Sequence, residues 1–339
     1  MGAYVINSIK TGKVEPSYRT YTRENDIVHA FTRFLFATIY AYTLMNLPLL
    51  DFHDRVNYLI YASDSDFIQT FYSHSWVSYL SNEPIWLAIN SYLTNHFRSD
   101  DVVRLIIFVS AFTTAWITLS QREHSLYLLV IVLFVPGILQ NFIVHLRQGL
   151  AISLFVIGYF SRHRTVACVF MASSALIHSA FFLINGMYII TVIINKSSYL
   201  TYFQKCCVAI SVSAIIPILI SFLSGWFEFR QVDEYRYAST SFSGLGFISW
   251  FAIFIVLLSG GRAFVIKNLF PVSITALYLA GYFVLPYSAR IIECALISIV
   301  ICGYSLPHNK KNVFVIIIAL QSAAFYLLNL NQNWFGWGV

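Results

Sequence analysis

Long apolar stretches alternate with short polar ones along almost the whole chain. The hydrocarbon core of a bilayer is about 30 Å thick, and a helix of about 20 apolar residues crosses it. Apolar windows that reach or approach this length cover residues 28–50, 102–120, 125–144, 148–160, 165–177, 179–195, 206–224, 244–259, 264–286, 290–305 and 312–330. They predict an all-α polytopic integral membrane protein with about 10 to 12 transmembrane helices.

Two stretches allow more than one interpretation. Residues 165–195 fit either two short helices broken near His178 or one long tilted helix. Residues 83–97 would extend only about 21 Å as a helix, so we expect a re-entrant or interfacial helix there. The predicted organisation begins with an N-terminal extension at residues 1–27. One transmembrane domain follows at residues 28–330, with larger extracytoplasmic loops at about 51–101 and about 225–243. A short tail at residues 331–339 ends it.

Composition supports a membrane protein and excludes other classes. Hydrophobic residues make up 58% of the chain and charged residues 11%, whereas soluble proteins carry about a quarter charged residues. The five cysteines lie in apolar stretches and form neither a disulfide framework nor a zinc motif. The net charge of +6 comes from basic residues placed between apolar runs, which does not indicate nucleic-acid binding.

The distribution of charge predicts the orientation in the membrane. The polar N-terminus lacks the early apolar region of a signal peptide, so we place it in the cytoplasm, with the first apolar run as an anchor. Cytoplasmic connections then hold 14 of the 21 Lys and Arg residues, and 11 of the 15 acidic residues lie outside. This bias agrees with the positive-inside rule. Treating residues 83–97 as a full span would reverse it.

Arginines at the predicted extracytoplasmic side are the first candidates for chemistry. Arg147 and Arg290 each stand at the start of an apolar run, and Arg230 lies in the late outer loop. A guanidinium group stays protonated and matches the geometry of phosphate oxygens, so converging arginines suit a lipid-linked diphosphate. The alternative is that these side chains only extend to lipid headgroups.

A histidine and several acidic residues on the same side could act as bases. His178 is flanked by apolar residues, and its role is either that of a general base or that of a hydrogen-bonded interhelical residue. Asp54 and Glu83 in the first outer loop are further candidate bases, whereas Asp64 and Asp66 fit a solvated acidic loop.

Tyrosines in the outer loops complete the set of candidates. Tyr235 and Tyr237 alternate with charged residues in the late loop, a pattern that suits stacking on sugar rings as well as a purely structural loop.

The order of these features resembles the EpsG-like branch of the Wzy-type polymerases, which join polysaccharide repeat units. The resemblance covers about residues 30–300. Its motifs are Asp54 to Tyr58, Glu83–Pro84, Arg147–Gln148 followed by Ala151, Ile177–His178 followed by Ala180, and Arg290–Ile291.

This resemblance implies a glycosyltransferase of the bacterial inner membrane that works on the extracytoplasmic face, without a metal or cofactor. Donor and acceptor would be glycans on undecaprenyl diphosphate, with membrane lipids and a chain-length regulator as partners. The product would be O-antigen, capsule or exopolysaccharide. The resemblance also implies that Arg147, Gln148, His178 and Arg290 are functional positions. We expect Arg147 and Arg290 to clamp the diphosphate with help from Arg230, and His178, Glu83 or Asp54 to be the base.

Three other activities use similar residues. They are a ligase for lipid-linked glycans, a flippase or transporter, and a membrane O-acyltransferase of the cell envelope. A transporter would place charges near the middle of the bilayer, often within an internal repeat. The charges here gather at one face instead, and the sequence shows no clear repeat.

Overall fold

The structure, a computed structural model, describes residues 23–72, 76–121, 123–223 and 244–339. Within these ranges every regular element is a helix, apart from one isolated antiparallel bridge between Phe52 and Gly338. The all-α prediction is confirmed. Most of the predicted N-terminal extension and all of the late outer loop lie outside the described residues.

The helices follow one another with short connections. They are α1 (Arg23–Met45), α2 (Arg55–Tyr72), α3 (Trp76–Ser81), α4 (Pro84–Thr94), α5 (Ser99–Leu119), α6 (Leu126–Leu133), α7 (Pro136–Ile143), α8 (Leu146–Phe160), α9 (Arg164–Ile177), α10 (Ala180–Lys196), α11 (Tyr202–Leu223), α13 (Leu245–Ser259), α14 (Arg262–Lys267), α15 (Leu269–Gly281), α16 (Ser288–Tyr304), α17 (His308–Leu328) and the 3-10 helix η1 (Asn333–Gly336).

The described residues contain four helices that are long and apolar enough to cross a membrane: α1, α5, α11 and α17. The bent pair α6 and α7 makes a fifth candidate, and α8, α9, α10, α13 and α15 are shorter apolar helices of 10–17 residues. The chain is therefore a polytopic membrane protein. The predicted 10 to 12 spans require the shorter helices to cross as well.

Two predicted spans are interrupted. The window 125–144 bends by 56° between α6 and α7, just before Pro136, since the residue preceding a proline is disfavoured in helical conformation. The window 264–286 was wrong as a single helix: it divides into α14 and α15 at Asn268, whose backbone is not helical. At His178 the backbone is extended, which confirms the two-helix interpretation of residues 165–195.

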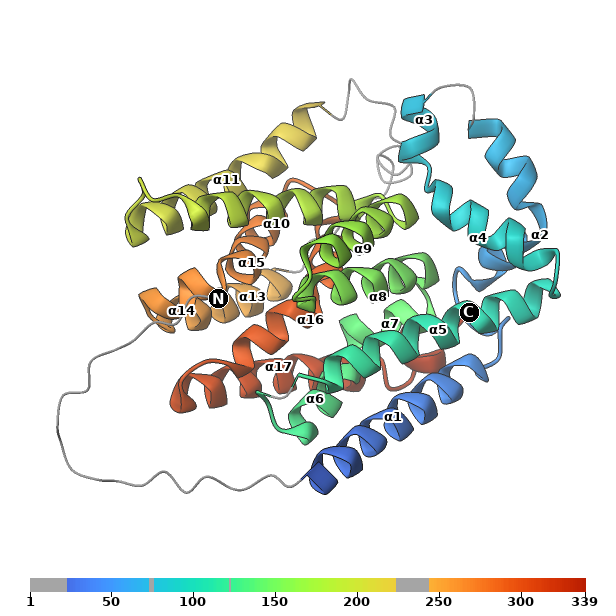
Figure 1. Ribbon diagram of the computed structural model, residues 1–339, viewed down its shortest axis with the longest axis horizontal. Coiled ribbons are helices and arrows are strands. Elements are labelled where there is room, and N and C mark those ends of the chain that lie inside the picture. The colour runs from blue at the N-terminus through green and yellow to red at the C-terminus, as the bar shows by residue number, and fades with distance from the viewer. Residues whose placement is uncertain (1–22, 73–75, 122, 224–243) are drawn as a thin grey trace.

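The predicted first outer loop is largely helical. It contains α2, α3 and α4, and α4 agrees with the helix expected near residues 83–97. In Figure 1 these helices lie at the same end of the bundle as the C-terminus. A contact explains this position, because the amide of Val339 donates to the carbonyl of Asp51, 2.9 Å away.

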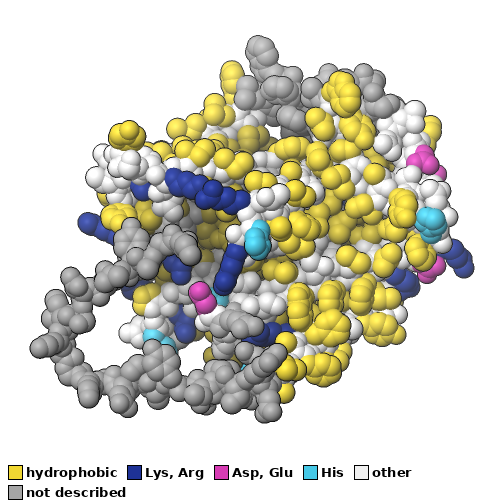
Figure 2. Space-filling model, viewed as in Figure 1, with side chains coloured by type: hydrophobic (Ala, Val, Ile, Leu, Met, Phe, Trp, Pro, Cys, Tyr) yellow, Lys and Arg dark blue, Asp and Glu magenta, His cyan; other side chains and the backbone are white. Residues whose placement is uncertain are grey.

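The predicted inner connections contact one another at the opposite end. The ring of His124 lies against Tyr304 with centroids 6.1 Å apart, and Lys205 Nζ donates to the carbonyl of Asn195 at 2.6 Å. Between the two ends the surface is apolar: Phe31 on α1 is 64% exposed and Leu320 on α17 is 65% exposed. Figure 2 shows hydrophobic side chains over much of this face, with charged side chains left of its middle and at its right edge. Such a belt suits a lipid environment.

Candidate functional site

Five of the predicted site residues lie where helices begin, at the predicted extracytoplasmic end of the bundle. Asp54 and Glu83 directly precede α2 and α4, His178 lies two residues before α10, and Arg147 and Arg290 stand in the first turns of α8 and α16. The first turn of a helix presents unpaired N–H groups and a partial positive charge. This end of the bundle is therefore favourable for an anion.

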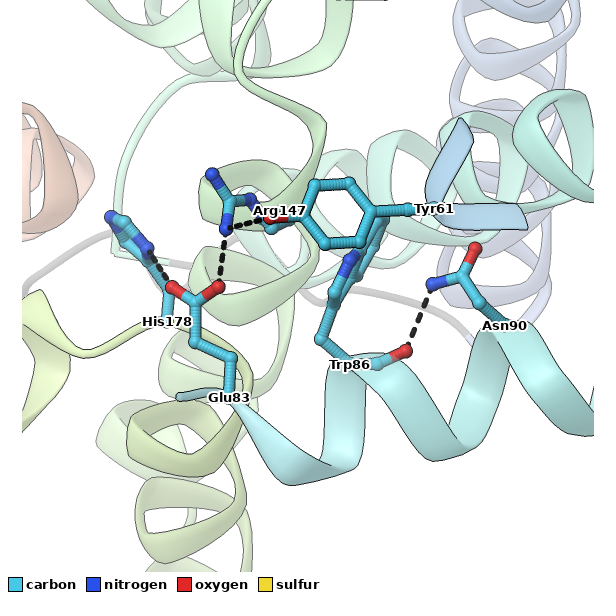
Figure 3. Close-up of polar contacts among 6 residues, drawn as sticks. All are labelled: Tyr61, Glu83, Trp86, Asn90, Arg147 and His178. Atoms are coloured by element: carbon cyan, nitrogen blue, oxygen red, sulfur yellow. Dashed lines mark hydrogen bonds and ion pairs between the residues drawn. The ribbon is translucent and has the colours of Figure 1, made fainter. Parts of the chain in front are cut away.

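Glu83 is the centre of the site (Figure 3). One carboxylate oxygen, Oε1, lies 3.0 Å from Nδ1 of His178, and the other, Oε2, pairs with Nη1 of Arg147. The side chains of Glu83 and His178 are only 7% and 6% exposed. Three segments that are far apart in the sequence thus meet at one buried carboxylate.

The backbone of Glu83 is strained. Its φ of 62° is in the left-handed region, which residues other than Gly, Asn and Asp rarely adopt. Pro84 restricts it further, because a residue before proline prefers an extended conformation. Strain of this kind persists only where surrounding contacts hold it, and it concentrates at functional sites. Here the two contacts of the carboxylate can hold it.

Glu83 is ionised at neutral pH. Burial by itself raises the pKa of this carboxyl, but Arg147 and His178 outweigh burial and lower the pKa to about 2. A general base works best when its pKa is near the operating pH. Glu83 is therefore poorly suited to remove a proton from a substrate.

The contact with Glu83 determines how His178 can react. An ionised carboxylate only accepts hydrogen bonds, so Nδ1 of His178 donates and carries the proton. In the neutral imidazole the other nitrogen, Nε2, is then a proton acceptor. Of the three expected bases, His178 has the geometry for the role, and Glu83 orients it.

Aromatic side chains line Arg147. Its guanidinium carbon lies 5.1 Å from the ring centroid of Tyr61, and its Nη1 donates to the Tyr61 hydroxyl at 3.4 Å. The rings of Tyr58 and Tyr61 both meet Trp86 edge-on, with centroids 5.7 and 6.2 Å apart. The sequence identified Tyr58 but not the other two. Each stands one helical turn after a predicted site residue, which is the available signal.

Asp54 forms a second pair nearby, with His145. Its Oδ2 lies 3.6 Å from Nδ1 of His145, and its side chain is 41% exposed. The contact with His145 is the largest influence on Asp54 and lowers its pKa, with further contributions from Arg290 and Arg147. The sequence did not identify His145, although it stands two residues before Arg147.

Two other side chains hold this region together. Gln148 donates from Nε2 to the carbonyl of Arg290 at 3.4 Å, which joins α8 to α16. Arg55 is fully buried and donates from Nε to the carbonyl of Ile143 at 2.8 Å and from Nη1 to that of Pro48 at 3.0 Å. Arg55 therefore fixes the backbone beside Asp54.

The structure brings together seven of the ten predicted site residues: Asp54, Tyr58, Glu83, Arg147, Gln148, His178 and Arg290. The other three, Arg230, Tyr235 and Tyr237, lie outside the described residues.

Comparison with protein-family models, curated proteins and solved structures returned no match. The resemblance to the polymerases therefore rests on the sequence motifs themselves.

Proposed function

We propose that this protein is a glycosyltransferase of the bacterial inner membrane that polymerises repeat units carried on undecaprenyl diphosphate. The observation that carries the proposal is the contact of Glu83 with both Arg147 and His178 at the predicted extracytoplasmic end. This arrangement combines an oriented base with a fixed positive charge where three helices begin, α4, α8 and α10. Transfer from a lipid diphosphate needs both features.

In the proposed reaction His178 activates the acceptor. Its Nε2 takes the proton of an acceptor sugar hydroxyl while the hydroxyl oxygen attacks C1 of the donor sugar. The bond from C1 to the diphosphate oxygen breaks, and the electron pair leaves with undecaprenyl diphosphate. Glu83 stabilises the positive charge that forms on His178, as a buried carboxylate does for a catalytic imidazole.

Arg147 and Arg290 attract the departing diphosphate. Arg147 contacts Glu83 and Tyr61 through the same nitrogen, Nη1, while its second amino group points away from Glu83 in Figure 3. Arg290 lies close enough to Asp54 to lower the pKa of that carboxyl, which places it on the same side of the site. Arg147 and Arg290 thus act together as the clamp for the diphosphate, although Glu83 already offsets part of the charge of Arg147.

The test is glycan chain length in cells that lack the gene and carry it back on a plasmid. We expect deletion to leave glycans of one repeat unit, and wild type to restore the ladder of chain lengths on gels. His178→Gln and Arg290→Ala should fail to restore it at normal membrane levels. His96→Gln, an exposed histidine at the far end of α4, is the matched control and should restore it.

The same experiment separates the rival activities. Complete loss of surface glycan on deletion favours a flippase or a ligase. An unchanged ladder throughout contradicts polymerisation and favours an acyltransferase.

A further inference from the structure

The site contains two histidine–carboxylate pairs, and the reaction proposed above uses only one. In each pair the histidine meets the carboxylate through Nδ1, at 3.0 Å for His178 with Glu83 and 3.6 Å for His145 with Asp54. Each carboxylate belongs to a residue with left-handed backbone, φ 63° for Asp54 and 62° for Glu83, immediately before a helix. Two similarly built pairs in one site suit two different parts of the substrates.

The pairs differ in their access to solvent. The side chains of Glu83 and His178 are 7% and 6% exposed, whereas those of Asp54 and His145 are 41% and 20% exposed. A diphosphate headgroup is highly charged and loses least hydration at the more exposed position. The buried pair is suited to a sugar hydroxyl, and the exposed pair to the headgroup.

Charge balance also indicates a role for His145. The ionised carboxylates of Asp54 and Glu83 offset the guanidinium groups of Arg147 and Arg290. A diphosphate therefore needs additional positive charge. Of the carboxylates, guanidinium groups and imidazoles of these six residues, the two imidazoles are the groups that become positively charged by taking up a proton, and His178 is occupied by the acceptor in the proposed reaction.

The surroundings of His145 favour an anion. It directly precedes α8, whose first turn holds Arg147, and both Arg290 and His178 act on its charge. Burial lowers the pKa of His145, so the ring is mainly neutral when the site is empty. An arriving diphosphate favours the protonated ring, since a nearby opposite charge stabilises the charged form.

Building on the proposed function, we infer that His145 is a second catalytic residue, which donates a hydrogen bond from Nε2 to the donor diphosphate and is held in place by Asp54. As in the proposed reaction, the bond from the acceptor oxygen to C1 forms and the bond from C1 to the diphosphate oxygen breaks. His145 adds positive charge next to the oxygen that receives the electron pair as C1 departs. Asp54 is a positioning residue that accepts the hydrogen bond from Nδ1.

Binding of farnesyl diphosphate to the full-length protein in nanodiscs, measured by calorimetry, tests this inference. Farnesyl monophosphate serves as the comparison ligand. We expect His145→Gln to weaken diphosphate binding about tenfold or more, which is the usual effect of losing a charge-assisted hydrogen bond. His145→Lys, which keeps a positive charge, should restore most of the affinity. His178→Gln should bind as wild type does while forming no ladder.

The rate of polymerisation, rather than the stability of the protein, tests the role of Asp54. Asn tolerates left-handed backbone, so Asp54→Asn should fold. We expect it to slow polymerisation, and the double variant Asp54→Asn, His145→Gln to be no slower than His145→Gln alone. Independent, multiplicative losses would contradict the positioning role.

The outcomes distinguish the two proposals. Wild-type affinity in His145→Gln, or an equal loss in His178→Gln, overturns the inference about His145 and leaves the polymerase proposal standing. Failure of the wild-type protein to bind farnesyl diphosphate overturns both.

Discussion

A carboxylate as deeply buried as that of Glu83 persists in its charged form only because its neighbours compensate for lost hydration. Removing two charges from water costs several kcal/mol for each ion, and attraction between them repays this only with good geometry. Arg147 supplies that geometry from the first turn of α8, and His178 from the break between α9 and α10. The free energy of folding should therefore suffer most when one charge is removed and its partner stays buried without compensation.

A double-mutant cycle on this pair gives the first prediction. Glu83→Gln and Arg147→Met should each lower stability strongly, by about 3–5 kcal/mol, because each leaves a buried charge without its partner. The double variant should lose less than the sum of the two, with a coupling of up to about 3 kcal/mol. The measurement is the thermal unfolding temperature in detergent. Strictly additive losses would show that the two charges do not depend on each other.

Stability should also depend on pH through Glu83. Its pKa is lowered from the ordinary 4.5 to about 2, so its contribution is fully present above pH 4.5 and is lost as the pH falls toward 2. The difference in unfolding temperature between wild type and Glu83→Gln should stay constant from pH 5 to 8 and shrink below about pH 4.5. A difference that changes between pH 6 and 8 would contradict the assignment.

At the level of single residues, the sequence identified chemical types better than partnerships. It marked Glu83, Arg147 and His178, because charged and titratable groups beside apolar runs are unusual. It could not show that Glu83 binds the other two, which are 64 and 95 residues away, because tertiary packing sets these distances. For the same reason it predicted Arg147 mainly as a phosphate ligand.

At the level of elements, close contact between α7 and α8 positions Arg147. A methyl group added at Gly149 would overlap the backbone carbonyl oxygen of Asn141, which cannot move without shifting α7. We expect Gly149→Ala to destabilise the protein by about 1–3 kcal/mol and to abolish the glycan ladder. Gly186→Ala on α10 is the control, since nothing lies within 4 Å of the added methyl, and it should be neutral or slightly stabilising. Equal behaviour of the two variants would contradict this role for Gly149.

The C-terminal tail holds the backbone segment that directly precedes Asp54. The amide of His53 donates to the carbonyl of Trp337 at 3.1 Å, next to the bridge between Phe52 and Gly338. A side chain at Gly338 would lie 2.9 Å from the backbone oxygen of Asn333. Gly338→Val should therefore detach the tail and slow polymerisation several-fold, as measured by ladder length at equal membrane levels. Val339→Ala changes only an exposed side chain and should keep the full ladder.

The sequence located most elements, but it missed those whose apolar pattern is interrupted. Helix α2 was expected to be loop because Asp64 and Asp66 break its apolar run, and its backbone is indeed kinked at Asp64. The break at Asn268 was missed for the opposite reason, since apolar residues continue on both sides of it. Hydrophobic periodicity reports burial in lipid or protein, and it responds weakly to a local change of backbone direction.

At the level of the whole molecule, the two sets of connections lie at opposite ends of the bundle. The predicted outer set contains the site and the C-terminal tail, and the predicted inner set contains Lys205 and the loop around His124. The fold places these two sets of connections at opposite ends. The excess of Lys and Arg in the inner set predicts which side of the membrane each end faces. Orientation decides whether the site can meet glycans that have already crossed the membrane.

Labelling of single cysteines in intact cells tests the orientation. With the five native cysteines replaced, Phe97→Cys lies at the site end and Tyr199→Cys at the other end, and these positions are 51% and 94% exposed. A maleimide that cannot cross the inner membrane should label Phe97→Cys and spare Tyr199→Cys, although Tyr199 is the more exposed position. After membrane disruption both should react, which controls for local access. The reverse pattern in intact cells would place the Glu83 site in the cytoplasm, and the proposed use of glycans on the extracytoplasmic face would then be wrong.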